Sequence, residues 1–226
     1  YEMLRSLVGS EMCIRDRRAI DKKIVQIVVH QLRDYSKDKH KRVDDTQFGG
    51  GAGMVMSVQP ISSIIDKLKS ERFYDEIIYM SPDGLRFNQS HANQLSSCGN
   101  IIILCGHYKG IDQRVRDTLV THEYSIGDYI ITGGELSSLV ILDSIVRLIP
   151  GVLNNMQSAK TDSFEDVLLD SDYYTRPEEY RGLKVPKILL SGHHSNIKEW
   201  KLKVKKQKTK ENRPDLWLNY KKNESE

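Results

Sequence analysis

The sequence predicts an α/β domain with a mostly parallel sheet flanked by helices, followed by a small, mainly helical C-terminal domain. Short, strongly apolar runs alternate with segments of helical periodicity between residues 24 and 149. Strands that are apolar at nearly every position are expected where helices cover both faces of a sheet. From residue 151 onward the chain becomes polar and then strongly basic, which indicates a second domain.

The individual elements follow from periodicity and from helix-ending residues. In one helical segment Ile61, Ile64, Ile65 and Leu68 fall on the same face. A later helical segment is apolar over most of its length and is stopped by a Pro-Gly pair. The expected helices cover residues 60–69 and 135–149, with a basic helix near the C-terminus, and the expected strands cover residues 24–29, 76–80, 101–105 and 129–132.

Composition is that of an ordinary water-exposed globular chain, with 29% charged residues and a net charge of +3. That net charge alone does not require a nucleic-acid partner. The local distribution is more informative, because residues 198–210 carry seven lysines against Glu199 alone. Such a stretch either binds phosphates or forms the solvated face of a helix, and the sequence leaves both open.

Cysteine and histidine usage argues against a metal site or a disulfide framework. Cys13, Cys98 and Cys105 show no ligand spacing, and free thiols fit a reducing cytoplasm. His193 and His194 are adjacent, so their side chains point in different directions and no metal is predicted there. No apolar run reaches membrane-spanning length and no secretory signal is apparent, so we expect a cytoplasmic protein.

Glycine-containing loops follow three of the expected strands. They are Ser81-Pro82-Asp83-Gly84, Gly106-His107-Tyr108-Lys109-Gly110 and Gly133-Gly134. In parallel α/β sheets, ligands bind beyond the carboxyl ends of the strands, and glycine allows the backbone to approach a ligand closely. The loops therefore predict a backbone-lined site suited to an adenine and a ribose, with ordinary tight connections as the alternative.

Other nucleotide-binding patterns are absent from the sequence. There is no G-x-x-x-x-G-K-[ST] motif. The glycine run at residues 49–53 is followed by Met54, so it fails G-x-G-x-x-G. Nucleoside triphosphate and dinucleotide sites are therefore not favoured.

Seven motifs occur in order along the chain with family-like spacing. They are VDDTQFGGGAGMVM (43–56), LCGHYKGID (104–112), YSIGDYIITGGEL (124–136), RLIPGVL (147–153), DSF (162–164), YTRP (174–177) and VPKILLSGHH (185–194). Together they resemble the bacterial tRNA (guanine-N1)-methyltransferases of the SPOUT class. The resemblance extends from about residue 18 to the C-terminus.

The resemblance implies a fold and an activity that spacing alone does not. It implies a deep trefoil knot formed around the glycine loops, which no local rule predicts. It implies S-adenosylmethionine as methyl donor and a homodimer with active sites at the subunit interface. The implied acceptor is N1 of the guanosine at tRNA position 37, directly 3′ of the anticodon. The resemblance leaves a need for Mg²⁺ open, and the sequence assigns that ion to no residue.

The resemblance also assigns candidate cofactor-binding residues. Ile130 and Ile131 carry an alternative, because their side chains could instead pack in the core. The residues carried over directly are Gly106, Ile126, Gly127, Asp128, Tyr129, Ile130 and Ile131, and those expected to complete the site are Tyr79, Pro82, Tyr108, Gly133, Gly134 and Leu136.

Methylation of guanine N1 requires removal of its proton, a positive group for charge developing on O6, and fixed alignment with the methyl group. By resemblance Asp162 is the base, and its alternative role is a helix N-cap. Arg147 fits the positive group because it stays charged and can donate two hydrogen bonds. Its alternative is an intrahelical pair with Asp143, four residues earlier.

Two features depart from the family pattern. Many members have Glu where this chain has Lys109, and Arg where it has His107, so details of guanine recognition are expected to differ. Residues 1–17 match nothing, where the family opens with a strand of the type F-D-I-I-T. We expect this segment to be foreign or misread sequence, which would leave the sheet without one strand.

The expected domain organisation follows from these assignments. Competing hypotheses are a knotted methyltransferase acting on ribosomal RNA or on a ribose 2′-hydroxyl, and an inactive RNA-binding relative. The expected parts are an unmatched segment at 1–17, a knotted S-adenosylmethionine-binding catalytic domain at 18–153, a linker with the catalytic aspartate at 154–170 and a helical tRNA-binding domain at 171–226.

Overall fold

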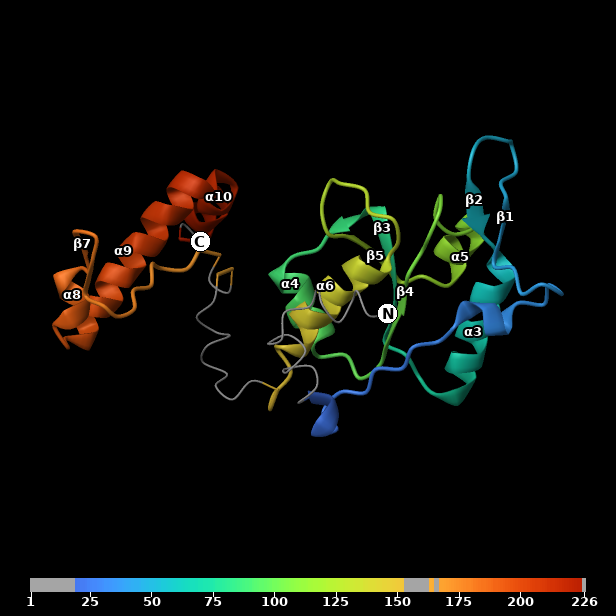
Figure 1. Cartoon of the computed structure of the whole chain (residues 1–226), viewed down its shortest axis with the longest axis horizontal. Helices are drawn as coiled ribbons and strands as arrows, with labels where there is room; N and C mark the ends of the chain where they lie inside the picture. Colours follow the sequence, from blue (N-terminus) through green and yellow to red (C-terminus); the bar gives the residue numbers. More distant parts are fainter. Residues whose placement is uncertain (1–18, 153–162, 165–166, 225–226) are drawn as a thin grey trace. The chain divides into compact units, whose positions relative to one another are not determined.

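The computed structural model describes residues 19–152, 163–164 and 167–224 of the chain. The expectations for residues 1–17 and for Asp162 therefore concern positions outside the described residues. Figure 1 shows the chain with its labelled helices and strands.

The chain divides into two compact units, Tyr1–Asn154 and Asn155–Glu226. The first contains a three-stranded parallel sheet with the strand order β4-β3-β5. The predicted α/β class with a parallel sheet is confirmed. The central strand is β3 (Glu76–Arg86), and its neighbours are β4 (Ile101–Leu104) and β5 (His122–Ser125).

Helices cover both faces of this sheet (Figure 1). Successive side chains of β3 alternate between two apolar cores, as the two-residue repeat of a strand requires. Ile77 and Tyr79 belong to one core, whereas Ile78 and Met80 belong to the other. The first core includes residues of α3 (Val58–Glu71) and α5 (Gln113–Thr118), and the second includes residues of α4 (Gln89–Leu95) and α6 (Glu135–Val146).

Both helices predicted from apolar periodicity are confirmed. The four apolar residues predicted for one face of α3 are all buried; they are Ile61, Ile64, Ile65 and Leu68. α6 begins at the predicted residue, Glu135, and ends at Val146, somewhat before the predicted end at residue 149. Its last turn is followed by turns at residues 147–152 rather than by more α-helix.

The predicted strand over residues 129–132 is wrong. The strand in this part of the chain is β5, and an irregular segment follows it from residue 126. The Ser125 hydroxyl donates to the carbonyl of Gly127 at 3.1 Å, and Gly127 has a φ of 152°, so the chain turns out of the sheet. β5 has the polar sequence HEYS, which explains why apolar character pointed to the wrong residues.

The predicted strand over residues 24–29 is also wrong. Val28 and Val29 are 57% and 82% exposed, and no described residue pairs with this segment in a sheet. An apolar run becomes a strand only when another strand accepts and donates its backbone hydrogen bonds.

The Ser81–Gly84 segment, predicted as a loop, lies inside β3. The register of β3 against β5 shifts between Met80 and Leu85, which marks a bulge. A Cβ on Gly84 would lie 2.5 Å from the backbone carbonyl carbon of Glu123. Glycine is therefore required there by the close approach of two strands.

A small antiparallel hairpin precedes α3. It consists of β1 (Asp44–Thr46) and β2 (Met54–Met56) and follows the short 3₁₀ helix η1 (Leu32–Tyr35). The Gln59 side chain in α3 donates to the carbonyl of Tyr35 at 2.9 Å, which ties η1 to the core helix.

The second unit is mainly helical in its described part. Leu168 is almost fully buried, and the backbone N–H of Leu169 donates to Thr209 Oγ1 at 2.9 Å, so this segment packs on the long helix α9. The elements are β6 (Glu179–Tyr180), β7 (Leu183–Lys184), α8 (Lys187–Leu190), α9 (His194–Asn212) and α10 (Pro214–Asn223).

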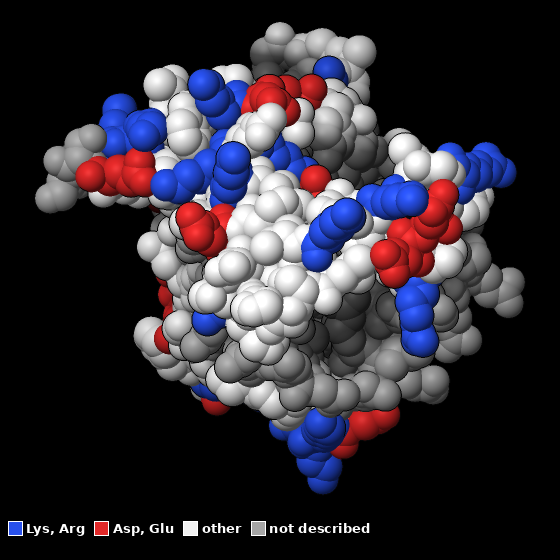
Figure 2. All heavy atoms as spheres, turned by 90° about the vertical axis from the view of Figure 1, so that its left-hand side faces the viewer, with Lys and Arg blue, Asp and Glu red and all other residues white. Residues whose placement is uncertain are grey.

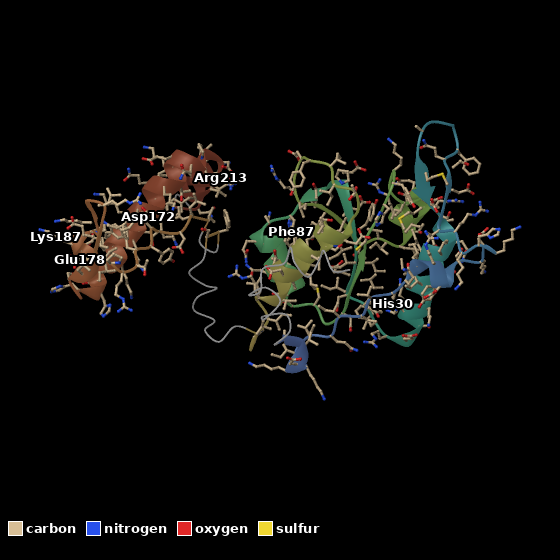
Figure 3. The ribbon with its side chains drawn as sticks, viewed as in Figure 1. His30, Phe87, Asp172, Glu178, Lys187 and Arg213 are labelled. Atoms are coloured by element: carbon tan, nitrogen blue, oxygen red, sulfur yellow. The ribbon has the colours of Figure 1, made fainter. Side chains whose placement is uncertain are left out.

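Two lysines of α9 pair with carboxylates of the same unit. Lys208 lies 2.9 Å from Asp172, which Figure 3 labels, and Lys206 lies 2.9 Å from Glu224. Figure 2 shows Lys and Arg side chains interleaved with Asp and Glu on one face of the molecule. Within the described ranges, no helix has both the length and the apolar character needed to cross a membrane.

Candidate functional site

Two loops meet at the carboxyl ends of β4 and β5. They are named here the β4 loop (residues 105–112) and the β5 loop (residues 126–134). The backbone N–H of Gly134 donates to the carbonyl of Gly106 at 2.8 Å, and His107 forms an isolated antiparallel bridge with Gly133. The structure thus brings Gly106, Gly133 and Gly134 together where a parallel sheet binds ligands.

The glycines at this junction are needed because the chains approach so closely. A Cβ on Gly134 would lie 2.9 Å from both the Cα of Cys105 and the backbone nitrogen of Gly106. A Cβ on Gly106 would lie 2.9 Å from ring carbon Cε2 of Tyr79. Any larger residue would push the two loops apart or displace the ring beneath them.

Tyr79 supports the β4 loop from within the sheet. Its side chain is only 4% exposed, and its hydroxyl oxygen would lie 3.0 Å from a Cβ built on Gly110. Burial raises the pKa of the Tyr79 phenol, while the charge of nearby Arg116 opposes that rise. Tyr79 therefore stays a neutral hydrogen-bonding group under the loop.

The other predicted cofactor-binding residues divide between buried and exposed positions. Gly127 is buried and Ile126 is half-buried, whereas Pro82 and Asp128 are exposed. The core-packing alternative for Ile130 and Ile131 is wrong, because neither side chain is buried in this chain. The exposed apolar and aromatic members are Tyr108 (60%), Tyr129 (58%), Ile130 (84%), Ile131 (36%) and Leu136 (48%).

Side chains add two further links between the β4 loop and the start of α6. His107 Nε2 lies 2.5 Å from Glu135 Oε1, and the Cys105 thiol lies 3.1 Å from the Ser138 hydroxyl. Burial raises the pKa of the Cys105 thiol, so this sulfur remains protonated rather than becoming a nucleophile. The contacts hold the loop in place and give it no nucleophilic chemistry.

The β1–β2 hairpin lies directly against the β4 loop. The backbone N–H of Lys109 donates to the Met54 carbonyl at 3.1 Å, and that of Met56 donates to the Gly110 carbonyl at 2.9 Å. The Lys109 stem covers Gly53, where a Cβ would lie 2.9 Å from Lys109 Cγ. The hairpin that carries Asp44 and the glycine run is therefore part of the same assembly.

Arg116 joins three elements beneath the site, and the sequence reasoning missed it. Its guanidinium donates to Glu123 at 2.7 and 2.8 Å and to Asp83 at 3.0 Å, and it lies over the Tyr79 ring. These contacts connect α5 with β3 and β5, and the carboxylates raise the pKa of Arg116. No local pattern relates Arg116 to Asp83, thirty-three residues away.

Replacing Arg116 with Gln is expected to lower the free energy of unfolding by about 1–2 kcal/mol. The substitution removes three charge-assisted hydrogen bonds. The expected loss of stability is smaller than for three buried bonds, because the Asp83 side chain is well exposed and solvent screens its charge. Urea denaturation measures the change. Arg114→Gln is the control, since its pair with Asp112 is local and Arg114 is exposed. Equal losses in the two variants would contradict the bridging role.

Of the two predicted catalytic residues, the structure describes Arg147 but not Asp162. Arg147 is half-buried and follows α6 directly, and its backbone N–H donates to the Asp143 carbonyl at 3.3 Å. Asp162 lies outside the described residues. Its neighbour Ser163 lies in a turn, and the Ser163 hydroxyl accepts a hydrogen bond from the Asp170 backbone at 2.9 Å.

Comparisons with known proteins agree on one family. The family model described as tRNA (Guanine-1)-methyltransferase TrmD matches residues 2–219. This match includes most of residues 1–17, so the expectation that this segment matches nothing in the family is wrong. Three relatives are each called a tRNA (guanine-N(1)-)-methyltransferase. That of Flavobacterium psychrophilum is 56% identical over 215 residues, covering 95% of this chain and 94% of its own length. That of Azobacteroides pseudotrichonymphae is 60% identical over 200 residues, covering 88% of this chain and 90% of its own length.

The third relative, from Bacteroides fragilis, is 57% identical over 204 residues, covering 90% of this chain and 91% of its own length. The family match spans nearly the whole chain, and the relatives are matched over nearly their whole length. This chain belongs to the tRNA (guanine-1)-methyltransferase family.

Proposed function

We propose that this protein transfers the methyl group of S-adenosylmethionine to N1 of the guanosine at position 37 of tRNA, next to the anticodon. The similarity to relatives named for N1 methylation supports the reaction. The structural observation that carries the proposal is the junction of the β4 and β5 loops at the carboxyl ends of a parallel sheet. There the Gly134 N–H donates to the Gly106 carbonyl at 2.8 Å.

The residues at this junction fit an adenosine-like group. Main chain without side chains is available at Gly106, Gly133 and Gly134, and the exposed Ile130 and Leu136 offer apolar surface for a flat base. S-adenosylmethionine supplies an activated methyl group on its sulfonium. We assign its binding to the predicted residues of the two loops, with Tyr79 holding the β4 loop in position.

The acceptor chemistry is assigned to Asp162 and Arg147. Guanine N1 becomes nucleophilic when its proton leaves, and we propose that the Asp162 carboxylate accepts it. Negative charge then develops on O6, which the Arg147 guanidinium stabilises. Arg147 follows α6, the helix that begins at the glycine junction, so α6 connects the two parts of the reaction. We assign Mg²⁺ to no residue.

We further propose that the enzyme works in the cytoplasm as a homodimer with the family's trefoil knot. Leu136 and Val140 are each 48% exposed and lie one turn apart on α6, which gives an apolar surface for a second subunit. The catalytic domain is assigned to residues 18–153 and the linker to 154–170. Residues 171–226 are assigned to tRNA binding through the lysines of α9.

A methylation assay with product analysis tests the proposal. The full chain is incubated with methyl-labelled S-adenosylmethionine and a tRNA transcript that carries guanosine at position 37. Digestion to nucleosides is expected to give labelled N1-methylguanosine. The matched control transcript carries adenosine at position 37, and it is expected to accept no label.

The competing hypotheses predict different results in the same assay. Label on a ribose 2′-hydroxyl, or label on ribosomal RNA but not on tRNA, would indicate a different knotted methyltransferase. Binding of S-adenosylmethionine without transfer to any RNA would indicate an inactive relative. Either result would overturn the proposed function.

A further inference from the structure

Phe48 is the most exposed large apolar residue in the part of the chain that the structure describes, at 101%. It lies in the segment of residues 47–53 that joins β1 to β2, the strands labelled in Figure 1, and this segment is called here the hairpin tip. A single exposed apolar side chain needs no explanation by itself. The surroundings of Phe48 are what suggest a ligand.

The backbone after Phe48 leaves the ring unobstructed. Gly49, Gly50 and Gly51 have φ values of 85°, 78° and 110°, which glycine adopts without strain. A Cβ built on Gly49 or Gly50 would have nothing within 4 Å. Gly49 and Gly50 therefore add no side chain next to the ring, whereas the Gln47 side chain lies against Gly51. A flat ligand can approach the exposed Phe48 ring.

The base of the hairpin is attached to the proposed methyl-donor site. β2 exchanges backbone hydrogen bonds with the β4 loop through Met54 and Met56, at 2.9 to 3.1 Å. The backbone N–H of His107 also lies 3.2 Å from the Met56 sulfur. A base held at the tip would thus be held at a fixed position relative to the β4 loop.

The same hairpin surface also carries a cation, which lies at Gly53. Lys109 of the β4 loop lies along Gly53, so its ammonium group is carried on the same hairpin surface. An exposed aromatic ring and a lysine on one hairpin surface are a combination that binds unpaired nucleotides, because the ring stacks on a base and the cation attracts a phosphate. Bases in RNA loops are unstacked and available for such contacts.

We infer that Phe48 stacks on a base of the tRNA anticodon loop beside the target guanosine, while Lys109 attracts a neighbouring phosphate. This inference rests on the proposed function, because it takes tRNA as the substrate. It adds a substrate-binding role for the hairpin tip. A stacked ring is tolerant of base identity, so it would hold the loop in place without selecting its sequence.

Substitutions at Phe48 test the stack by their effect on tRNA binding. Phe48→Ala is expected to raise KM for tRNA about tenfold, the size expected for loss of one base–aromatic stack. Phe48→Trp is expected to retain the wild-type KM for tRNA. Phe48→Leu is expected to have a raised KM for tRNA, close to that of the alanine variant. The dissociation constant for S-adenosylmethionine, measured by calorimetry, is expected to stay unchanged in all three.

Phe73→Ala is the matched control, because Phe73 is also exposed, at 77%, but follows α3. It is expected to leave KM for tRNA unchanged. The inference is overturned if Phe48→Ala keeps wild-type KM, if Phe48→Leu performs as well as Phe48→Trp, or if Phe73→Ala raises KM equally. Absence of any tRNA methylation by the wild-type chain would instead overturn the proposed function.

The salt dependence of tRNA affinity distinguishes the stacking role of Phe48 from the electrostatic role of Lys109. The logarithm of the tRNA association constant falls with the logarithm of salt concentration in proportion to the phosphates neutralised. Lys109→Gln is expected to reduce that slope by about one. Phe48→Ala is expected to lower affinity at every salt concentration with the slope unchanged. A smaller slope in Phe48→Ala would contradict stacking as its role.

Discussion

Replacing Asp162 with alanine is expected to lower kcat for methyl transfer to tRNA by about 10²–10⁴-fold. A positioned general base contributes a factor of this size, because without it guanine N1 keeps its proton and remains a poor nucleophile. The dissociation constant for S-adenosylmethionine is expected to stay unchanged, since the proposed base acts on the acceptor. Single-turnover rates at saturating tRNA, together with calorimetry of S-adenosylmethionine binding, measure the two quantities.

Asp162→Asn distinguishes a base from a helix N-cap, the alternative role for this residue. Asparagine caps a helix about as well as aspartate, but it cannot accept the proton. If Asp162 is the base, both variants lose activity equally while the asparagine variant keeps its melting temperature. Restoration of activity by asparagine would show that the carboxylate acts through structure alone, and the base would have to be sought elsewhere.

Elements that satisfy a local pattern could be predicted from the sequence. The stripe formed by Ile61, Ile64, Ile65 and Leu68 predicted α3 correctly, because all four side chains bury against one face of the sheet. The apolar run at Ile101–Leu104 predicted β4 for the same reason, since helices cover both faces there. In both elements burial is fixed by neighbouring residues, so local periodicity is sufficient.

Elements decided by distant contacts could not be predicted in this way. β5 is polar because its Glu123 pairs with Arg116 rather than entering a core, so an apolar pattern misses it. The Ser81–Gly84 segment stays in β3 because Gly84 packs on the β5 backbone, although its residues are typical of a turn. The determining partner in each case lies far away in sequence.

The glycines of the candidate site could be predicted from the sequence. The side-chain contacts that hold its loops in place could not. Strand-end glycines indicated a close backbone approach, and Gly106 and Gly134 do meet through a hydrogen bond. The His107–Glu135 pair and the contact of Lys109 with Gly53 join segments that only the fold brings together. The sequence marked His107 and Lys109 as departures from the family pattern, but it gave no partner for either.

Replacing Gly134 with alanine is expected to weaken S-adenosylmethionine binding by at least tenfold and to lower stability by about 1–3 kcal/mol, the cost of overpacking a closely packed position. Gly134 has an ordinary φ of −77°, so conformational strain is not the reason. The reason is contact: the new Cβ would lie 2.9 Å from Cys105 Cα and from the Gly106 nitrogen, and backbone atoms cannot rotate away. Calorimetry and thermal unfolding measure the two effects.

Gly99→Ala is the matched control for Gly134→Ala, because Gly99 precedes β4 as Gly134 precedes α6. A Cβ on Gly99 would make an ordinary 3.5 Å contact with the Asp75 carboxylate, and the Gly99 N–H would keep its hydrogen bond to Asp75. The free energy of unfolding of Gly99→Ala is expected to differ from that of the wild type by less than about 0.5 kcal/mol. If Gly134→Ala bound S-adenosylmethionine as tightly as Gly99→Ala, the junction of the β4 and β5 loops could not be the methyl-donor site. A Cβ at Gly134 separates the two loops, so any ligand held by both must lose affinity when they move apart.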